Sequence, residues 1–523
     1  MPYSAEGAND EHITNVSSNE IPLLVTSLAD WVKTISKDSL DKFNIDAKDF
    51  NEYKVLPRLL FGQYLTAQFK LLEKQAGEKG IIYQTLYNSE VTDIIDHPDR
   101  EMVAVEINGS ERFEFQHVIV CTGHNWPRKH EGAIPGYFDS PYPPVKLALT
   151  VNHPVAIKGS SLTAVDAVRT LARYNGTFKK DAQGKLSYQL SAQSPDFKMV
   201  LHTRNGMLPA VRFHLEDSHL SYRSVLDDKE IETHIAANNG FLSLDFVFEK
   251  DFLAPIKEKD PKFYEKIKDM NLEQFVAAML ELREKLDPFE LLKIEYAEAE
   301  ASIRNKESIY WKEMLGVLSF TLNYPAKYLS AEDMQRLRQS LMPLISIVIA
   351  YIPQSSSEEL LALHDAGLLD LIPVGDDGKV EPVTTGGAIY HYKDKLGEQQ
   401  SVFYNTYVDC VGQPHLDFAD LPFKSLLNNR TVSPARLRFR SIAEGRTAKL
   451  SGLEVTEAEN GDHYMRVPGI AINDHFQVVD AYGALNDRIH MMATPYIGGY
   501  NPDYSGLDFS EAASSAIVKQ LLP

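Results

Sequence analysis

The chain has 523 residues, of which 44% are hydrophobic and 24% are charged, values typical of a globular protein rather than of a disordered one. Its 73 acidic residues outnumber its 53 basic ones, and the formal charge of −20 argues against non-specific binding to nucleic acid, because phosphate contacts need a basic surface. Two cysteines without a C-x-x-C pair exclude a disulfide scaffold and a dithiol centre, and they indicate a reducing compartment.

The N-terminal segment and the apolar runs indicate no membrane or secretion route. Residues 1–20 are polar and acidic, unlike a secretory signal. The longest apolar run, residues 341–352, is interrupted by a proline and a serine and is far shorter than the roughly 20 residues of a membrane span. We therefore expect a cytoplasmic protein without a membrane partner. No H-E-x-x-H motif or metal-ligand cluster is present, so no metal site is predicted.

The first half of the chain has the pattern of an α/β layer fold. An apolar strand is predicted at residues 116–120, a second at 155–159 and a third at 198–202. The second strand turns directly into a helix with one apolar face, formed by Leu162, Val165, Val168 and Ala172. Strand, glycine turn, helix and strand in this order predict a βαβ unit.

Between about residues 251 and 367 the pattern changes to long amphipathic helices. One of them has an expected apolar face of Phe275, Met279, Leu282 and Leu286. Capping boxes are predicted at residues 330–333 and 356–359. We interpret this segment as a helical insertion that covers a site or packs a dimer, without a catalytic role. The strand pattern returns at residues 401–410 and 489–492, and a short helix ends the chain.

One local pattern occurs twice, at residues 118–123 and 407–412. In each copy an apolar strand is followed by a cysteine and, two residues later, by a glycine, Gly123 or Gly412. Small residues at a strand end allow the backbone to approach a bulky ligand such as a dinucleotide. The alternative is a pair of ordinary tight strand exits.

The turn between the second strand and its helix is the predicted phosphate site. Its residues are Gly159, Ser160, Ser161, Leu162 and Thr163. A helix that begins directly after a strand presents free N–H groups and the positive end of its dipole to an anion. The G-x-G-x-x-G fingerprint is degenerate here, and the alternative is an ordinary serine-capped helix.

Arg204 follows the third predicted strand, where the adenosine ribose is expected. An acidic residue at this place selects NAD, and a basic one accommodates the additional phosphate of NADP. Arg204 therefore favours NADP, and the alternative is a surface arginine in a turn.

Two further segments are candidates for chemistry. The C-terminal string from Gly498 to Glu511 is a glycine-rich turn that leads into a helix, and a helix N-terminus aimed at a flavin would stabilise negative charge on the reduced ring. His12 is a candidate proton shuttle, because its unperturbed pKa lies near neutrality. The alternatives are a plain terminal helix and a structural histidine.

These pieces together resemble the FAD/NAD(P)-binding flavoproteins, two-dinucleotide proteins related to N-hydroxylating and flavin-containing monooxygenases. The resemblance implies an α/β fold with two Rossmann-like domains and a helical insertion. It would divide the chain into a discontinuous FAD domain (1–148 and 465–523), an inserted NAD(P) domain (149–245 and 370–464) and a helical insertion (246–369). The stretches that carry it follow the family's order along the chain: residues 1–4, 12–15, 56–65, 118–124, 157–166, 203–206, 409–413 and 501–508.

The resemblance also implies site residues. Thr122 and Gly123 would line FAD, Val91 would meet its adenine, and Asn15 would border the isoalloxazine ring. The other implied flavin contacts are Asn501, Gly506, Leu507, Asp508 and Phe509. NADPH would contact Gly159, Ser160, Ser161, Leu162, Thr163 and Arg204, with Gly412 and Gln413 at the second strand exit.

The function expected from this resemblance is that of an FAD-dependent, NADPH-consuming oxidoreductase that hydroxylates a small molecule through a flavin hydroperoxide. One departure from the family pattern qualifies this expectation. In the family, a first βαβ unit with the G-x-G-x-x-G for the FAD pyrophosphate precedes the Met-Pro-Tyr-Ser stretch, which here starts at Met1. The alternative function is therefore a catalytically inactive or truncated nucleotide-binding relic.

Overall fold

The computed structural model describes residues 3–522 with the exception of 47, 49, 52, 124–127, 218–225, 413–414 and 501–505. Its centre is a five-stranded sheet in which every neighbouring pair is parallel, in the order β12-β11-β8-β16-β7. The strands are β7 (Tyr137–Phe138), β8 (Pro154–Lys158), β11 (Lys198–Thr203), β12 (Leu369–Pro373) and β16 (Thr406–Asp409). This sheet confirms the predicted α/β class.

The predicted βαβ unit is β8, helix α4 (Leu162–Asn175) and β11. Val165, Val168 and Ala172 of α4 are buried as expected, because they form the helix face that packs on the sheet. The chain continues from β8 to β11 on one side and returns to β16 on the other. The order of the strands therefore reverses between β8 and β16, and the carboxyl ends of these two strands border the crevice where α/β sheets bind ligands.

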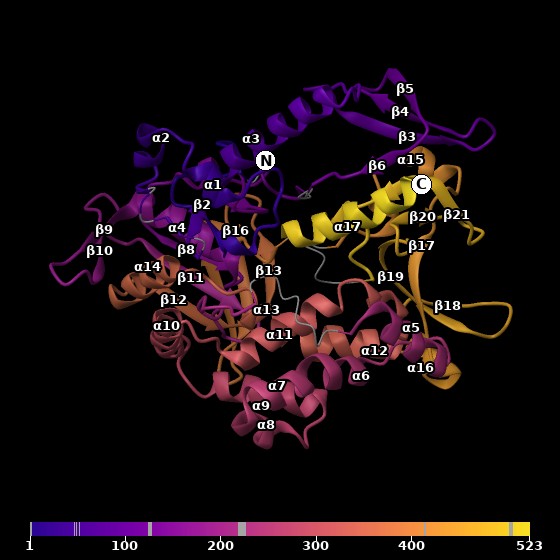
Figure 1. Ribbon diagram of the computed structural model, residues 1–523. Coiled ribbons are helices and arrows are strands. Elements are labelled where there is room, and N and C mark those ends of the chain that lie inside the picture. Colours follow the sequence, from indigo (N-terminus) through magenta and orange to yellow (C-terminus); the bar gives the residue numbers. More distant parts are fainter. Residues whose placement is uncertain are drawn as a thin grey trace.

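The connection from α4 to β11 is a hairpin of β9 (Gly176–Lys180) and β10 (Leu186–Leu190). Figure 1 shows this hairpin projecting from the body of the molecule. Its two strands pair in register from Lys180 with Leu186 to Gly176 with Leu190.

The two faces of the parallel sheet are covered differently. One packs against α4 and α14 (Gln354–Asp365), with Leu360 and Leu363 in the shared core. The other is covered by an antiparallel sheet of β13 (Lys379–Pro382), β14 (Ala388–Lys393) and β15 (Gln399–Tyr404). There His202 of β11 stacks on Tyr390 with ring centroids 4.1 Å apart. The single strand that was predicted at 401–410 is in fact β15 followed by β16.

The N-terminal segment joins the C-terminal one through a second parallel contact. Strand β6 (Val118–Val120) pairs in parallel with β21 (Leu485–Met491), which pairs antiparallel with β20 (Gln477–Val479). Figure 1 shows these strands beside the last helix, α17 (Gly506–Leu521). The other elements of the N-terminal segment are β1 (Ile13–Ser17), α1 (Leu28–Val32), α2 (Lys37–Asp41), β2 (Val55–Pro57), α3 (Arg58–Glu78), β3 (Val91–His97), β4 (Met102–Ile107) and β5 (Glu111–Phe115).

The helical segment lies between β11 and β12. Its helices are α5 (Asp228–Ala237), α6 (Leu244–Phe248), α7 (Ala254–Lys259), α8 (Pro261–Ile267), α9 (Leu272–Glu284), α10 (Pro288–Asn305), α11 (Tyr310–Thr321), α12 (Ala331–Arg336) and α13 (Met342–Val348), followed by α14. Residues 249–253 and 337–341 form π-helical turns within it.

The expected details of the helical segment were correct in part. Ser330 caps α12, since its side chain accepts a hydrogen bond from the Asp333 N–H. Ser356 is not a cap, because the chain turns helical already at Gln354, directly after Pro353. On α9, Phe275 is buried but Leu282 is exposed, so the buried face is narrower than predicted.

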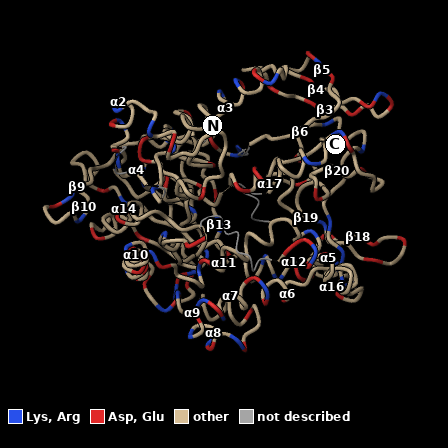
Figure 2. Tube along the Cα trace, in the orientation of Figure 1, with Lys and Arg blue, Asp and Glu red and all other residues tan. Residues whose placement is uncertain are grey.

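A further three-stranded sheet shares the core of the helical segment. Its strands are β17 (Pro434–Arg438), β18 (Val455–Glu457) and β19 (His463–Ile470), with helices α15 (Lys424–Asn428) and α16 (Ile442–Leu450) beside it. Across the whole molecule, acidic and basic residues are interspersed along the trace (Figure 2). Among the described residues, no helix combines the length and the apolar character that crossing a membrane requires.

We predict that Gly159→Ala lowers the free energy of unfolding by about 1–3 kcal/mol, since Gly159 has φ +106° and an added Cβ would lie 3.0 Å from the Cys410 carbonyl oxygen. The measurement is urea denaturation. Gly184→Ala is the control, because Gly184 also has a positive φ but has no atom near its Cβ position. Equal losses in the two variants would contradict the close approach of β8 and β16.

Candidate functional site

The structure brings the predicted phosphate turn and the second strand exit together. Gly159 directly follows β8, and its N–H donates to the His202 carbonyl at 2.8 Å. Gly412, with φ +96°, follows the adjacent strand β16. Ser161 is the N-cap of α4, and its side chain makes no cap hydrogen bond. The Ala164 N–H donates to the Ser161 carbonyl at 2.8 Å, so the N–H groups of Leu162 and Thr163 are the ones that this turn can offer to a ligand.

The hydroxyl groups of this turn differ in their roles. Ser160 donates to the Met207 carbonyl at 2.7 Å, which ties the turn to the segment after β11. Ser161, Leu162 and Thr163 are half-buried at the start of α4. Ser160 thus fixes the turn, and Leu162 packs partly against the core of the sheet and α4.

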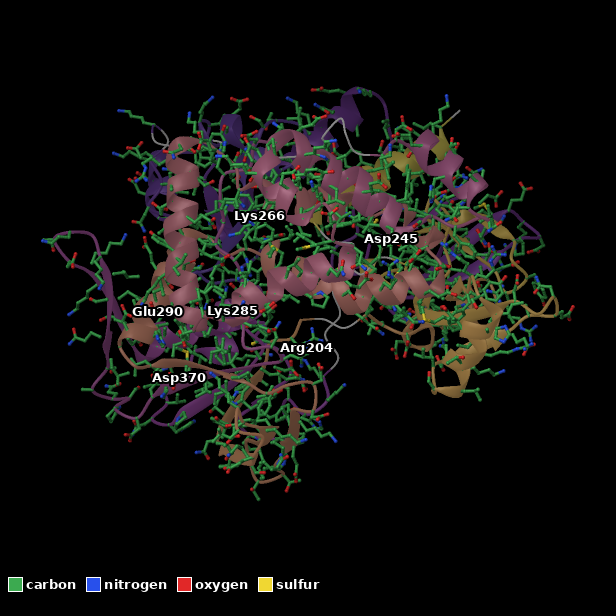
Figure 3. The ribbon with its side chains drawn as sticks, turned by 90° about the horizontal axis from the view of Figure 1, so that it is seen from below. Arg204, Asp245, Lys266, Lys285, Glu290 and Asp370 are labelled. Carbon is green, nitrogen blue, oxygen red and sulfur yellow. The ribbon has the colours of Figure 1, made fainter. Side chains whose placement is uncertain are left out.

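Arg204 lies at the end of β11 as predicted and is well exposed. Its Nε is 3.6 Å from Asp376 Oδ1, in the turn after β12. Backbone hydrogen bonds from Val374 to Thr203 and from Gly375 to Arg204 hold that turn in place. Figure 3 shows Arg204 away from Asp370. Asp370 lies within β12 and pairs with Lys198 at the other end of β11. Sequence reasoning missed Asp376, because only the sheet order brings it to Arg204.

On the flavin side, Thr122 and Gly123 are exposed directly after β6. Among the described residues, no atom lies within 4 Å of the Cβ position of Gly123, which leaves room for a ligand on that side. Val91 begins β3 and is 40% exposed. Gln413 and Asn501 lie outside the described residues.

The structure brings Asn15 and the start of α17 to the same region. Leu507 packs on the N-terminal core cluster together with Val16 and Ile21. Desolvation raises the pKa of Asp508, and the charge of Glu20 adds to this rise, so the two carboxyl groups are neighbours.

The other two predicted residues of α17 have structural roles. Gly506 has φ +84°, which favours glycine at the first residue of the helix. Phe509 is buried, and its ring centroid is 5.8 Å from that of Phe476. Its side chain therefore supports the helix from the core side.

A buried arginine fixes the strand that carries Asn15. Arg212 donates to the Asn15 carbonyl at 2.5 Å and to Ser17 Oγ at 2.8 Å, and it forms an ion pair with Glu20. Tyr351 donates its hydroxyl to the same Glu20 at 3.1 Å. The negative charge of Glu20 raises the pKa of Arg212 against the effect of burial, which keeps this pair charged.

His12 is buried, and both of its ring nitrogens have partners. The Asn9 N–H donates to Nδ1 at 3.1 Å, so the neutral ring carries its proton on Nε2 and donates it to Thr170 Oγ1 at 3.1 Å. Thr170 in turn donates to Glu11 at 2.7 Å. Burial lowers the pKa of His12. These contacts join the N-terminal segment to α4, which is the structural role considered above.

A second buried network at this interface was not predicted. Arg58 forms an ion pair with Asp166 of α4 at 2.6 Å, and Tyr142 donates its hydroxyl to the same carboxylate at 2.5 Å. Arg58 also donates to the Ile13 carbonyl at 3.1 Å. The available signal was Asp166 itself, an acidic residue within the apolar face of a predicted helix.

Two cavities flank the N-terminal segment. One of about 470 Å³ lies beside the short helix Ser18–Glu20, and its lining includes Tyr53, His214 and Glu216. The other, of about 780 Å³, lies between Tyr3 and the first half of α3. The first cavity adjoins the strand of Asn15 and has the size of a small-molecule site.

Comparisons with known proteins agree with this arrangement. Residues 1–125 match the family model of FAD-NAD(P)-binding proteins, and residues 227–349 match that of the YdhS-like middle domain. The protein YdhS of Escherichia coli (strain K12) is 27% identical over 429 residues, which are 82% of this chain and 78% of YdhS. These findings confirm the predicted resemblance to FAD/NAD(P)-binding flavoproteins, and FAD with a nicotinamide dinucleotide is the cofactor pair of the matching family.

Solved structures of flavin monooxygenases also align with the chain. FAD-bound DfoA of Erwinia amylovora, a cadaverine monooxygenase, aligns at a TM-score of 0.40 and 10% identity over 99% of this chain and 85% of DfoA. The L-lysine 6-monooxygenase of Pseudomonas syringae aligns at a TM-score of 0.39 and 12% identity, over 97% of this chain and 86% of that protein. The α/β fold itself is seen in the five-stranded parallel sheet, and it agrees with the family match of residues 1–125.

We predict that the stability of the protein falls as the pH decreases below about 6.5, because the unfolded chain then protonates His12 while the buried, neutral ring does not. This residue can contribute at most about 1.4 kcal/mol per pH unit. The free energy of unfolding at pH 7 and pH 5.5 should differ less in His12→Gln than in the wild type. His97→Gln is the control, and an unchanged difference in His12→Gln would contradict the prediction.

Proposed function

We propose that this relative of the FAD-NAD(P)-binding proteins is an FAD-dependent, NADPH-consuming oxidoreductase that hydroxylates a small molecule in the cytoplasm. The observation that carries the proposal is the junction of Gly159 and Gly412 at the reversal of strand order, since this is where dinucleotides bind to α/β sheets. The family match of residues 1–125 supports a flavoprotein oxidoreductase in general terms. Hydroxylation as the specific reaction is our proposal and goes beyond that match.

The nicotinamide side fits its cofactor. A Cβ at residue 159 would fill the space next to the Cys410 carbonyl, which only glycine leaves open at that φ. The N–H groups at the start of α4 would hold the phosphates, and Arg204 would hold the 2′-phosphate of NADPH. Gly412 and Gln413 would border the nicotinamide end.

The flavin side fits the ring end of FAD. Thr122 and Gly123 leave the exit of β6 open, and the N-terminus of α17 lies beside the strand of Asn15. FAD, when bound, supplies hydride acceptance and oxygen activation. In this proposal the N-terminus of α17 stabilises negative charge on the reduced ring, and Asn15 orients it. Val91 would contact the adenine, and Asn501 is a further proposed flavin contact.

The domain division follows from these roles. Residues 1–148 and 465–523 would form the FAD part, 149–245 and 370–464 the NAD(P) part, and 246–369 the helical insertion. His12 remains the catalytic candidate only if its contacts with Asn9 and Thr170 open, since they occupy both ring nitrogens.

The proposed activity predicts that the purified full chain, incubated with FAD and freed of excess cofactor, retains flavin absorbance and oxidises NADPH. Retained flavin is measured by absorbance, and NADPH oxidation by the loss of its own absorbance under air. A protein that remains colourless after reconstitution would contradict the proposal and favour the nucleotide-binding relic.

Cofactor preference gives a sharper prediction. A charge-assisted contact of Arg204 with the 2′-phosphate is worth about 1.5–3 kcal/mol, so NADPH should bind about ten- to a hundredfold more tightly than NADH. Arg204→Ala should remove most of this difference. Asp376→Asn should increase it, because the carboxylate 3.6 Å from Arg204 repels the phosphate and competes for the guanidinium.

The affinities are measured by titration of both dinucleotides into the full chain. Lys198→Met is the matched control, since Lys198 is also a cation of β11 but pairs with Asp370 at the opposite end. If NADPH and NADH bind with equal affinity, and Arg204→Ala changes neither affinity, then Arg204 is a surface residue without a role in cofactor choice.

A further inference from the structure

Arg338 is a partly buried cation at an irregular place in the helical segment. It lies in the π-helical turn 337–341, between α12 and α13. π-Helical turns are rare and are frequent at functional sites. Burial lowers the pKa of Arg338, and no charged group among the described residues offsets this effect.

Other buried or half-buried arginines of this protein pair with carboxylates. The pairs are Arg58 with Asp166, Arg169 with Glu359, Arg212 with Glu20, Arg283 with Glu295, and Arg488 with Asp96. Arg336, two residues before Arg338, collects Asp245, Glu273 and Asp333. Asp245 of this cluster is labelled in Figure 3, on the helical segment.

Arg338 differs from all of these. Its Nη2 donates to the Gly499 carbonyl at 2.6 Å, and no carboxylate of the described residues lies within ion-pair distance. A guanidinium has five N–H donors, so most of them remain available. A partly desolvated cation without a counterion is costly, and the cost disappears when an anion binds.

The position of Arg338 connects it to the proposed cofactor sites. Gly499 lies a few residues before α17, whose start is beside the strand of Asn15. The preceding residue, Gly498, has its Cβ position only 2.0 Å from the imidazole of His415, three residues after Gly412. Arg338 therefore contacts the glycine pair 498–499, which lies against His415 and precedes α17 in the chain. Figure 1 shows α17 above the helices α11–α13.

We propose that Arg338 binds the carboxylate of a small-molecule substrate at the flavin end of the site. That the bound molecule is a substrate rests on the proposed function, whereas binding of a carboxylate to Arg338 does not require turnover. A carboxylate fits better than a phosphate, because one planar guanidinium offers two parallel N–H groups to two oxygens. A phosphate would be expected to gather several cations or a helix N-terminus, and Arg338 lies in the middle of a helical stretch.

The test uses the full chain and simple carboxylates as probes. Hexanoate and benzoate are titrated at constant ionic strength, with hexanamide and benzamide as neutral controls, and the melting temperature is recorded. We expect at least one carboxylate, but not its amide, to stabilise the protein in a saturable manner. Arg338→Gln should weaken this binding about ten- to a hundredfold, and Arg338→Lys should retain part of it, because it keeps the charge but loses the planar fork.

Arg446→Gln is the matched control, since Arg446 is an exposed arginine on α16 and should bind the carboxylate like the wild type. The proposal is overturned if no carboxylate raises the melting temperature more than its amide does. It is also overturned if Arg338→Gln binds the carboxylate as tightly as the wild type. A lower melting temperature with unchanged carboxylate affinity would show that Arg338 only holds the turn at Gly499.

A dinucleotide arm separates this inference from the proposed function. NADPH affinity should be the same in the wild type and in Arg338→Gln. If the variant instead loses NADPH affinity and keeps carboxylate affinity, the anion is a dinucleotide phosphate and the proposal is wrong. If the protein binds the carboxylate through Arg338 but retains no flavin, the oxidoreductase proposal fails while this one stands.

Discussion

Two buried ion pairs hold the N-terminal segment against the dinucleotide sheet, and the relative placement of the proposed cofactor sites depends on them. Arg58 of α3 reaches Asp166 of α4, and Arg212, in the segment after β11, reaches Glu20 beside β1. A buried charge that loses its partner costs about 3–5 kcal/mol, so neither pair can open without strain on the fold. The strand of Asn15 is therefore fixed relative to the helix whose first turn would hold the dinucleotide phosphates.

The same sheet explains how the chain accommodates its long helical segment. Strands β11 and β12 are parallel neighbours, so the chain must cross from the end of one to the start of the other. Helix α14 provides that crossover and packs with α4 in one core. Helices α5–α13 lie in the chain before α14, as an insertion into the crossover connection. Loop-closure entropy grows only slowly with length, so such an insertion costs the sheet little.

The sequence predicted those parts of the fold that depend on local pattern. Hydrophobic periodicity and turn residues predict the β8–α4–β11 unit, the Ser330 cap and the exit of β16 shortly before Gly412. What it could not show depends on tertiary neighbours: Asp376 meets Arg204 only through the strand order, and His12 meets Thr170 only through the packing of two segments. The hairpin β9–β10 was missed because its strands are short and largely exposed.

The helical segment was expected to cover a site or pack a dimer without a catalytic role, and its periodicity alone supports that view. The structure adds Arg338, which lies on the segment's π-helical turn and whose single partner among the described residues is the Gly499 carbonyl. Three carboxylates lie near this part of the helix, but all three pair with Arg336, two residues before Arg338. A helical covering that only excluded water would be more stable with an apolar residue at position 338. The cation there is better explained by a ligand that brings its own negative charge, and the helical segment then contributes selectivity as well as shielding.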